Sequence, residues 1–112
     1  MSGMAGNKGA VAIRLDYAQT SICFVTAHLA AGFSNYEERN QDYNTINQGL
    51  RFQRNRTLDD HDAVLFFGDF NYRIGLANEK VRQLIDAGDL EALYENDQVR
   101  PAHSSVSNIR KC

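Results

Sequence analysis

Residues 63–71 read Ala-Val-Leu-Phe-Phe-Gly-Asp-Phe-Asn, an apolar run that ends in a glycine and is followed at once by a carboxylate and a carboxamide. The apolar part, residues 63–67, predicts a short buried strand. Because side chains of an extended backbone point to the same side at every second position, we expect Asp69 and Asn71 to project together from the carboxyl end of that strand. Open α/β sheets place their chemistry at this edge.

Asp69 and Asn71 are therefore candidate catalytic residues. An ionised Asp can orient water or accept its proton, and an Asn amide can donate hydrogen bonds to phosphoryl oxygens as negative charge develops on them. The same residue types also favour turns, so a strand followed by an Asx turn without any catalysis is the alternative interpretation. This motif alone leaves both interpretations open.

Two further strands are predicted upstream. Residues 9–16 alternate in polarity, with Val11, Ile13 and Leu15 on one side, and residues 21–28 form a nearly continuous apolar run, as in a strand covered on both faces. The short polar segment 16–20 between them favours a hairpin.

Capping signals predict the helices. Ser34 and Glu37 form a capping box, and an apolar stripe follows it. The members of that stripe are Tyr36, Tyr43, Ile46 and Leu50. A second helix is expected to be capped by Asn78 and ended by Gly88, and Asp89 can cap a short last turn. The order strand, strand, helix, strand, helix predicts a mixed α/β layered fold.

Composition excludes several classes of protein. The chain has 112 residues, enough for one modest domain, and a net charge of −2 with a pI near 5.8. This charge gives no global attraction to nucleic acid or anionic lipid, so an anionic substrate must be drawn by a local basic site. Cys23 and Cys112 form no disulfide framework, and Cys23 lies in an apolar run without a basic loop after it, which disfavours a thiol mechanism. With no apolar run of membrane-spanning length and no leader, we expect a cytoplasmic protein.

Two more motifs join a strand-like run to a polar loop. They are Gly-Asn-Lys-Gly-Ala-Val-Ala-Ile-Arg at 6–14 and Val-Thr-Ala-His-Leu-Ala-Ala-Gly at 25–32. Together with Gly-Asp-Phe-Asn-Tyr-Arg-Ile at 68–74, they resemble the inositol polyphosphate 5-phosphatase family, in its synaptojanin-like branch. The resemblance implies part of a four-layer α/β/β/α sandwich of the deoxyribonuclease-like (endonuclease/exonuclease/phosphatase) type. Residues 1–99 would be a central part of the catalytic domain, and 100–112 an unmatched, disordered tail of the kind a truncated gene model produces.

The resemblance also assigns roles to individual residues. Asp69 would orient or deprotonate the attacking water, Asn71 would stabilise the pentacovalent phosphorus, and His28 would donate a hydrogen bond to the scissile phosphate. Asn7 and Lys8 would bind a phosphate of the substrate, Lys8 as a point charge. A strand-end histidine bonded to backbone and a solvated glycine-rich loop are the structural alternatives for His28 and for residues 7–8.

The implied activity is that of a phosphatidylinositol-polyphosphate 5-phosphatase, a phosphoric monoester hydrolase that uses Mg²⁺-assisted attack of water. The substrate would be a phosphoinositide or inositol phosphate, reached through peripheral contact with the membrane surface, and no nucleic acid partner is expected. The family's metal-binding Glu lies outside this chain, as do its Trp-Cys-Asp-Arg and Ser-Asp-His motifs, so we expect the isolated chain to be inactive. A catalytically dead phosphoinositide-binding fragment and a nuclease of the same superfold are the alternatives.

Basic residues cluster after the first predicted helix. Arg51, Arg54 and Arg56 are expected to compensate the carboxyl end of that helix rather than to form a lipid-facing patch. Within the helix, Arg39 and Asn40 match an Arg-Asn pair of the resembled family and are expected to be supporting residues.

Overall fold

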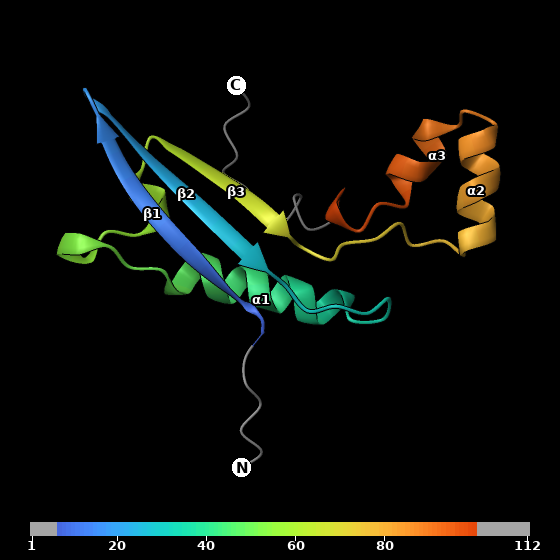
Figure 1. The fold of residues 1–112 in the computed structure, drawn as a ribbon, viewed down its shortest axis with the longest axis horizontal. Coiled ribbons are helices and arrows are strands. Elements are labelled where there is room, and N and C mark those ends of the chain that lie inside the picture. Colours follow the sequence, from blue (N-terminus) through green and yellow to red (C-terminus); the bar gives the residue numbers. More distant parts are fainter. Residues whose placement is uncertain (1–6, 101–112) are drawn as a thin grey trace, which may run out of the picture. The chain divides into compact units, whose positions relative to one another are not determined.

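The computed structural model describes residues 7–100, and the chain divides between Asn71 and Tyr72 into two compact units. The first unit contains the strands β1 (Gly9–Tyr17), β2 (Thr20–His28) and β3 (Ala63–Asp69) and the helix α1 (Tyr36–Gly49). The second contains the helices α2 (Asn78–Asp86) and α3 (Leu90–Glu95). Figure 1 shows these elements along the chain, and their order confirms the predicted one. The predicted tail at 100–112 lies, apart from Arg100, outside the described residues.

The three strands form one mixed sheet in the order β1, β2, β3. β1 and β2 are an antiparallel hairpin in which Gly9 lies opposite His28 and Tyr17 opposite Thr20, so its turn is shorter than the predicted 16–20 loop. β3 runs parallel to β2, with α1 in the crossover between them, and places Asp69 opposite His28. Because parallel neighbours end at the same edge of a sheet, the polar loops after β2 and β3 begin side by side.

Asp62 fixes the register of the parallel pair at its opposite end. Its carboxylate accepts hydrogen bonds from the Ser21 backbone amide at 2.7 Å and from the Ser21 hydroxyl at 2.8 Å. The Asp62 amide in turn donates to the Ser21 carbonyl at 3.0 Å. These bonds, above all the backbone one, hold the pKa of Asp62 below its usual value.

The core lies between α1 and one face of the sheet. Cys23 and Val25 are fully buried there, together with Leu58 from the segment after the helix. Tyr43 of α1 packs on Phe66 of β3 with ring centroids 5.3 Å apart. The predicted stripe of α1 is partly buried, as core packing requires. β2, however, is covered on one face and not on both as predicted, because within the described residues of the first unit only α1 and the segment after it cover the sheet.

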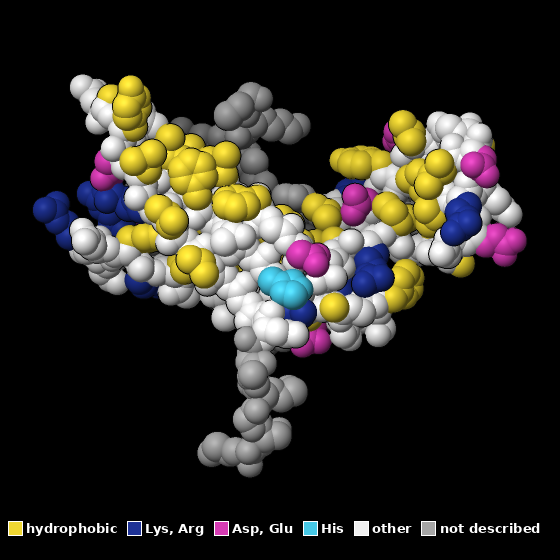
Figure 2. Space-filling model, in the orientation of Figure 1, with side chains coloured by type: hydrophobic (Ala, Val, Ile, Leu, Met, Phe, Trp, Pro, Cys, Tyr) yellow, Lys and Arg dark blue, Asp and Glu magenta, His cyan; other side chains and the backbone are white. Residues whose placement is uncertain are grey.

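The other face of the sheet is apolar and exposed. Val11 and Ile13 of β1 are 64% and 67% exposed, and Leu65 and Phe67 of β3 are 47% and 50% exposed. Hydrophobic side chains accordingly gather over the strands in Figure 2. The prediction that residues 63–67 form a buried strand is therefore wrong for the described chain, since β3 is an edge strand with one uncovered face. In a complete sandwich, a second sheet packs on such a face.

Two of the predicted caps are wrong. Ser34 does not cap α1, because Asn35 takes the cap position after a tight turn in which the Asn35 side-chain amide donates a hydrogen bond to the Ala31 carbonyl. Asn78 is the first residue of α2 rather than its cap, and its side chain accepts instead from Arg82. The end of α2 before the left-handed Gly88 and the side-chain cap of α3 by Asp89 are confirmed.

Candidate functional site

Leu29 joins the two loops at the carboxyl ends of β2 and β3. Its amide donates to the Asp69 carbonyl at 3.1 Å, and its carbonyl accepts from the Asn71 side-chain amide at 3.0 Å. The Leu29 side chain is 1% exposed, so this junction is anchored in the interior. Leu29 and Asn71 lie 42 positions apart in the sequence, and this hydrogen bond keeps them together at one edge of the sheet.

Asp69 and Asn71 are brought together by a turn and not by strand alternation. β3 ends at Asp69, and Asn71 adopts a left-handed backbone with φ of 55°. The Asn71 amide donates to the Asp69 carboxylate at 3.1 Å, which makes an Asx turn. The predicted alternating projection is therefore wrong, because β3 ends at Asp69 and the backbone of Asn71, two residues later, is left-handed. The turn nonetheless keeps both side chains at the same edge, so the turn and the site interpretations do not exclude each other.

Gly68 permits the close approach of β3 to β2 just before this turn. Its φ of 130° is rarely adopted by other residues, and a Cβ built there would lie 2.2 Å from the Ala27 carbonyl oxygen. Only glycine fits, so the glycine of the Gly-Asp-Phe-Asn motif is required by packing.

His28, Lys8 and Asp69 meet at the same edge. The Lys8 ammonium lies 3.0 Å from His28 Nε2, and the Asp69 carboxylate lies 3.9 Å from the same nitrogen. A lysine ammonium carries donors only, so in this arrangement His28 Nε2 is the acceptor of the hydrogen bond. Asn7 lies beside Lys8 in the chain and is exposed. The contact of Lys8 with His28 was not predicted, although the hairpin register, which pairs Gly9 with His28, could have indicated it.

α1 supports the loop that follows His28. Asp42 accepts a hydrogen bond from the Ala30 amide at 3.0 Å, and the guanidinium of Arg39, which is fully buried, donates to the carbonyls of Ala30 and Gly32 at 3.1 and 2.6 Å. These bonds bridge residues that are seven to twelve positions apart. Arg39 was expected to be a supporting residue, and these hydrogen bonds show how it supports the site: its side chain fixes the loop that follows His28.

The described residues do not complete a metal site by themselves. Within residues 7–100 no three His, Cys, Asp or Glu side chains lie close enough together to hold an ion. Asp69 supplies one carboxylate, and its near neighbours His28 and Lys8 offer no second hard oxygen donor of the kind that Mg²⁺ prefers. Over the same range, no helix is both long and apolar enough to cross a bilayer.

The comparisons with known proteins place this geometry in a family. The model of the Endonuclease/Exonuclease/phosphatase family 2 matches residues 1–111, and the chain belongs to that family. Within it, the chain is homologous over most of its length to the inositol polyphosphate 5-phosphatases. The predicted α/β fold and the resemblance to the synaptojanin-like branch are thus confirmed.

Individual relatives make the similarity concrete. Over 99 residues, covering 88% of this chain, it is 57% identical to an inositol-1,4,5-trisphosphate 5-phosphatase 1 of Schizosaccharomyces pombe and 50% identical to human synaptojanin-1. A solved inositol polyphosphate 5-phosphatase domain of a synaptojanin, in complex with inositol (1,4)-bisphosphate and a calcium ion, matches 94% of this chain with a TM-score of 0.85 and 52% identity. The chain spans 9% and 6% of the length of the two named relatives and 31% of the solved domain.

Proposed function

We propose that residues 1–99 are a central part of the catalytic domain of a phosphoinositide 5-phosphatase that hydrolyses the 5-phosphate of phosphatidylinositol polyphosphates. One observation carries the proposal. Lys8, His28, Asp69 and Asn71 meet at the carboxyl edge of β2 and β3, in a chain that is 52% identical to a 5-phosphatase domain solved with an inositol bisphosphate. Three of these side chains can donate hydrogen bonds to a phosphate group, and the fourth can accept a proton from water.

Asp69 is the residue that we assign to the attacking water. One carboxylate oxygen accepts from the Asn71 amide, and the other lies 3.9 Å from His28, beyond a direct hydrogen bond. The side chain is 68% exposed, so that second oxygen is open to water. It can orient the nucleophile and accept its proton during direct attack on the phosphorus. No covalent phosphoenzyme is part of this mechanism.

Asn71 is assigned to the charge that develops on the phosphoryl oxygens. A carboxamide nitrogen carries two N–H donors, and one of them is used on the Leu29 carbonyl. The second remains for the substrate. Because the first bond and the Asx turn fix the amide in advance, the donor is already oriented when charge builds on the phosphorus.

Lys8 and His28 are assigned to phosphate binding. An incoming phosphate offers the Lys8 ammonium a stronger, charge-assisted acceptor than a neutral imidazole nitrogen. When Lys8 turns to the phosphate, His28 no longer has to accept at Nε2, so the tautomer that carries its proton on Nε2 can donate a hydrogen bond to the scissile phosphate. Exposed Asn7 lies in the same loop and adds an amide donor for the substrate.

Mg²⁺ is the proposed cofactor, with ligands from outside residues 7–100, because these residues do not complete its site. No step above is routed through the metal. With a net charge of −2, the chain has no overall attraction to anionic lipid, so a cytoplasmic enzyme would reach a membrane substrate through peripheral contact by local basic groups.

A completed domain tests the proposal. Residues 7–100 replace the matching segment of the solved 5-phosphatase domain, and the chimera is assayed for phosphate release from vesicles of phosphatidylinositol bisphosphate, from soluble inositol trisphosphate, and for cleavage of plasmid DNA. We expect Mg²⁺-dependent phosphate release that is lost on Asp69→Asn, and intact plasmid. The isolated 112-residue chain should release no phosphate.

The same assay discriminates the alternatives. Lipid binding without phosphate release by the chimera would favour a catalytically dead binding segment, and plasmid cleavage would favour a nuclease of this superfold. The acceptor domain with its own segment restored is the positive control, since it shows that the flanking parts are competent.

A further inference from the structure

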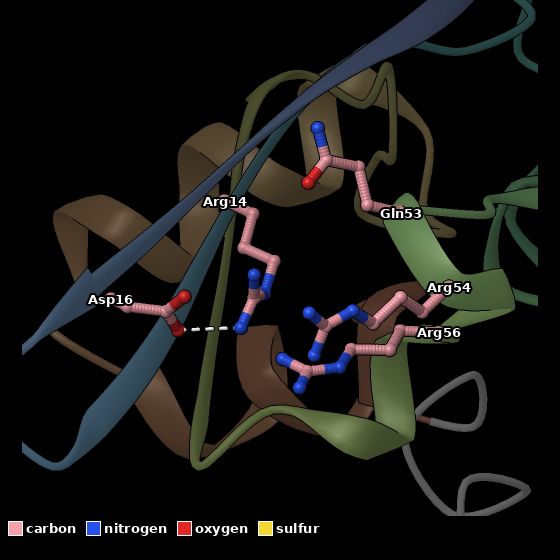
Figure 3. A pocket seen from close by; sticks show the side chains of 5 residues that line it. All are labelled: Arg14, Asp16, Gln53, Arg54 and Arg56. Carbon is pink, nitrogen blue, oxygen red and sulfur yellow. Dashed lines mark hydrogen bonds and ion pairs between the residues drawn. The ribbon is translucent and has the colours of Figure 1, made fainter.

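A second basic cluster lies on the α1 side of the sheet. Arg14 and Asp16 of β1, with Gln53, Arg54 and Arg56 of the segment after α1, line a hollow of about 240 Å³. Figure 3 shows the Arg54 and Arg56 guanidinium groups extending side by side toward that of Arg14. Arg14 is five residues from Gly9, which pairs with His28, so the cluster is about 17 Å along the strand from the catalytic edge.

The charges in this hollow are not balanced. The Asp16 carboxylate is paired with Arg14 at 2.5 Å, and Asp60 lies within electrostatic range of Arg56. Within residues 7–100, neither the Arg54 nor the Arg56 side chain forms a hydrogen bond or an ion pair, and the buried Nε of Arg14 has no partner. Like charges this close repel each other unless an anion lies between them. The predicted role at the helix end belongs to Arg51 alone, which donates to the Gln48 and Leu50 carbonyls.

The backbone that presents these arginines is fixed and strained. Arg54 and Asn55 have positive φ values of 62° and 58°, a conformation that an arginine seldom adopts. A hydrogen bond of 2.9 Å from the Phe52 amide to the Arg56 carbonyl closes the loop, and the Phe52 ring packs edge-on against His61. Strain at such a position is retained where the surrounding structure enforces it, often at a ligand site.

We propose that Arg14, Arg54 and Arg56 form a binding site for a phosphate group, separate from the hydrolytic edge. Planar guanidinium groups match the oxygens of phosphate in pairs, and a fixed loop lowers the cost of ordering them. The hollow is smaller than the pockets of roughly 300–1,000 Å³ that enclose drug-sized ligands. It therefore suits a single phosphate group, either as the free ion or as one part of a larger molecule. Inorganic phosphate, a soluble inositol phosphate and a lipid headgroup share this chemistry.

The location keeps the site accessible in a complete domain. Arg14 alternates along β1 with Ile13 and Leu15, which lie on the open apolar face that a second sheet would cover. The arginine cluster is on the opposite face, beside the helix layer, which is the outer layer of an α/β/β/α sandwich.

The test is a titration of the full chain with inorganic phosphate at constant ionic strength, followed by the arginine Nε–H resonances in ¹⁵N spectra. We expect shifts of the Arg14, Arg54 and Arg56 signals, and an affinity at least tenfold lower in the double variant Arg54→Gln, Arg56→Gln. Lys80→Gln is the matched control, because it removes an exposed charge of the same sign in α2, and it should change the affinity less than twofold. If the chain alone gives no dispersed spectrum, the same titration of the chimeric domain decides.

Parallel titrations with inositol trisphosphate and with phosphatidylcholine vesicles, with and without phosphatidylinositol bisphosphate, identify the source of the phosphate group. A loss of affinity in the double variant for any of these ligands supports the site. The ligand whose affinity falls most is the one that the site binds. Equal affinities of the double variant and Lys80→Gln in every arm, or shifts confined to the loop of Lys8 and His28, would overturn the proposal.

Discussion

Replacing Asp69 by Asn in the chimeric domain should abolish most of its turnover without loosening its structure. The Asn71 amide donates to one Asp69 oxygen, and the carboxamide oxygen of Asn can accept the same bond, so the Asx turn survives. The Asp69 and His28 side chains lie 3.9 Å apart and are 68% and 44% exposed, so solvent screens any interaction between them. Exposed pairs of this kind contribute about 0–1 kcal/mol, so the free energy of unfolding should fall by less than about 1 kcal/mol.

The effect on catalysis should be much larger. A positioned general base contributes about 10²–10⁴ in rate, which corresponds to about 3–5 kcal/mol of activation free energy. Because the base acts in the transition state, kcat should fall by that factor while KM changes little. Initial rates of phosphate release, measured on vesicles of phosphatidylinositol bisphosphate alongside thermal melts, give both quantities.

Asp62→Asn is the matched control. It removes a carboxylate from the opposite end of the same strand pair, where the Ser21 amide and hydroxyl bind it. We expect a lower melting temperature and an unchanged kcat, the reverse of the Asp69 variant. Full turnover in Asp69→Asn, or a loss of turnover that merely follows its melting temperature, would refute the assigned role.

Three further outcomes follow from the geometry. Gly68→Ala should destabilise the chimeric domain by about 3 kcal/mol or more in urea unfolding, since its Cβ would lie 2.2 Å from the Ala27 carbonyl at a φ of 130°; a change below about 1 kcal/mol would contradict that packing. Hydrogen bonds hold the pKa values of Asp60 and Asp62 below the usual 3.8, so stability should be fully present above about pH 4 and fall as the pH drops through their folded pKa values, with a slope that flattens in the double Asn variant. The 112-residue chain alone should bind a hydrophobic dye and associate, because one face of its sheet is apolar and exposed; a monomer with slowly exchanging strand amides would contradict this.

Local sequence patterns sufficed for the elements and failed where distant groups decide the conformation. The alternation in β1 and the apolar runs of β2 and β3 located the strands within one or two residues. The exposure of Leu65 and Phe67 could not be predicted from their apolar run, which is the same in a covered and an uncovered strand. The start of α1 was misplaced by one residue because the Asn35 side chain bonds Ala31, a competition that the capping pattern does not contain.

The candidate site shows the same limit. Asp69 and Asn71 were predicted from their place after an apolar run, and His28 from the family resemblance. The structure brings the three residues to one edge of the sheet, and their catalytic roles stay predictions. The left-handed turn at Asn71 and the buried guanidinium of Arg39 depend on backbone carbonyls of the loop after β2, and these are supplied only by the tertiary fold. The hollow at Arg14 could not be predicted from the sequence, because it is formed by one face of β1 together with the strained loop after α1, which are distant in sequence.

The position of the phosphate that is removed tests the central claim most directly. The chimeric domain is incubated with vesicles of phosphatidylinositol 4,5-bisphosphate and Mg²⁺, and the lipid product is separated by chromatography against the two monophosphate standards. We expect phosphatidylinositol 4-phosphate and one equivalent of inorganic phosphate, with no product from the Asp69→Asn variant. Formation of phosphatidylinositol 5-phosphate, or no lipid product from a folded chimera, would contradict a 5-phosphatase built on this edge of the sheet.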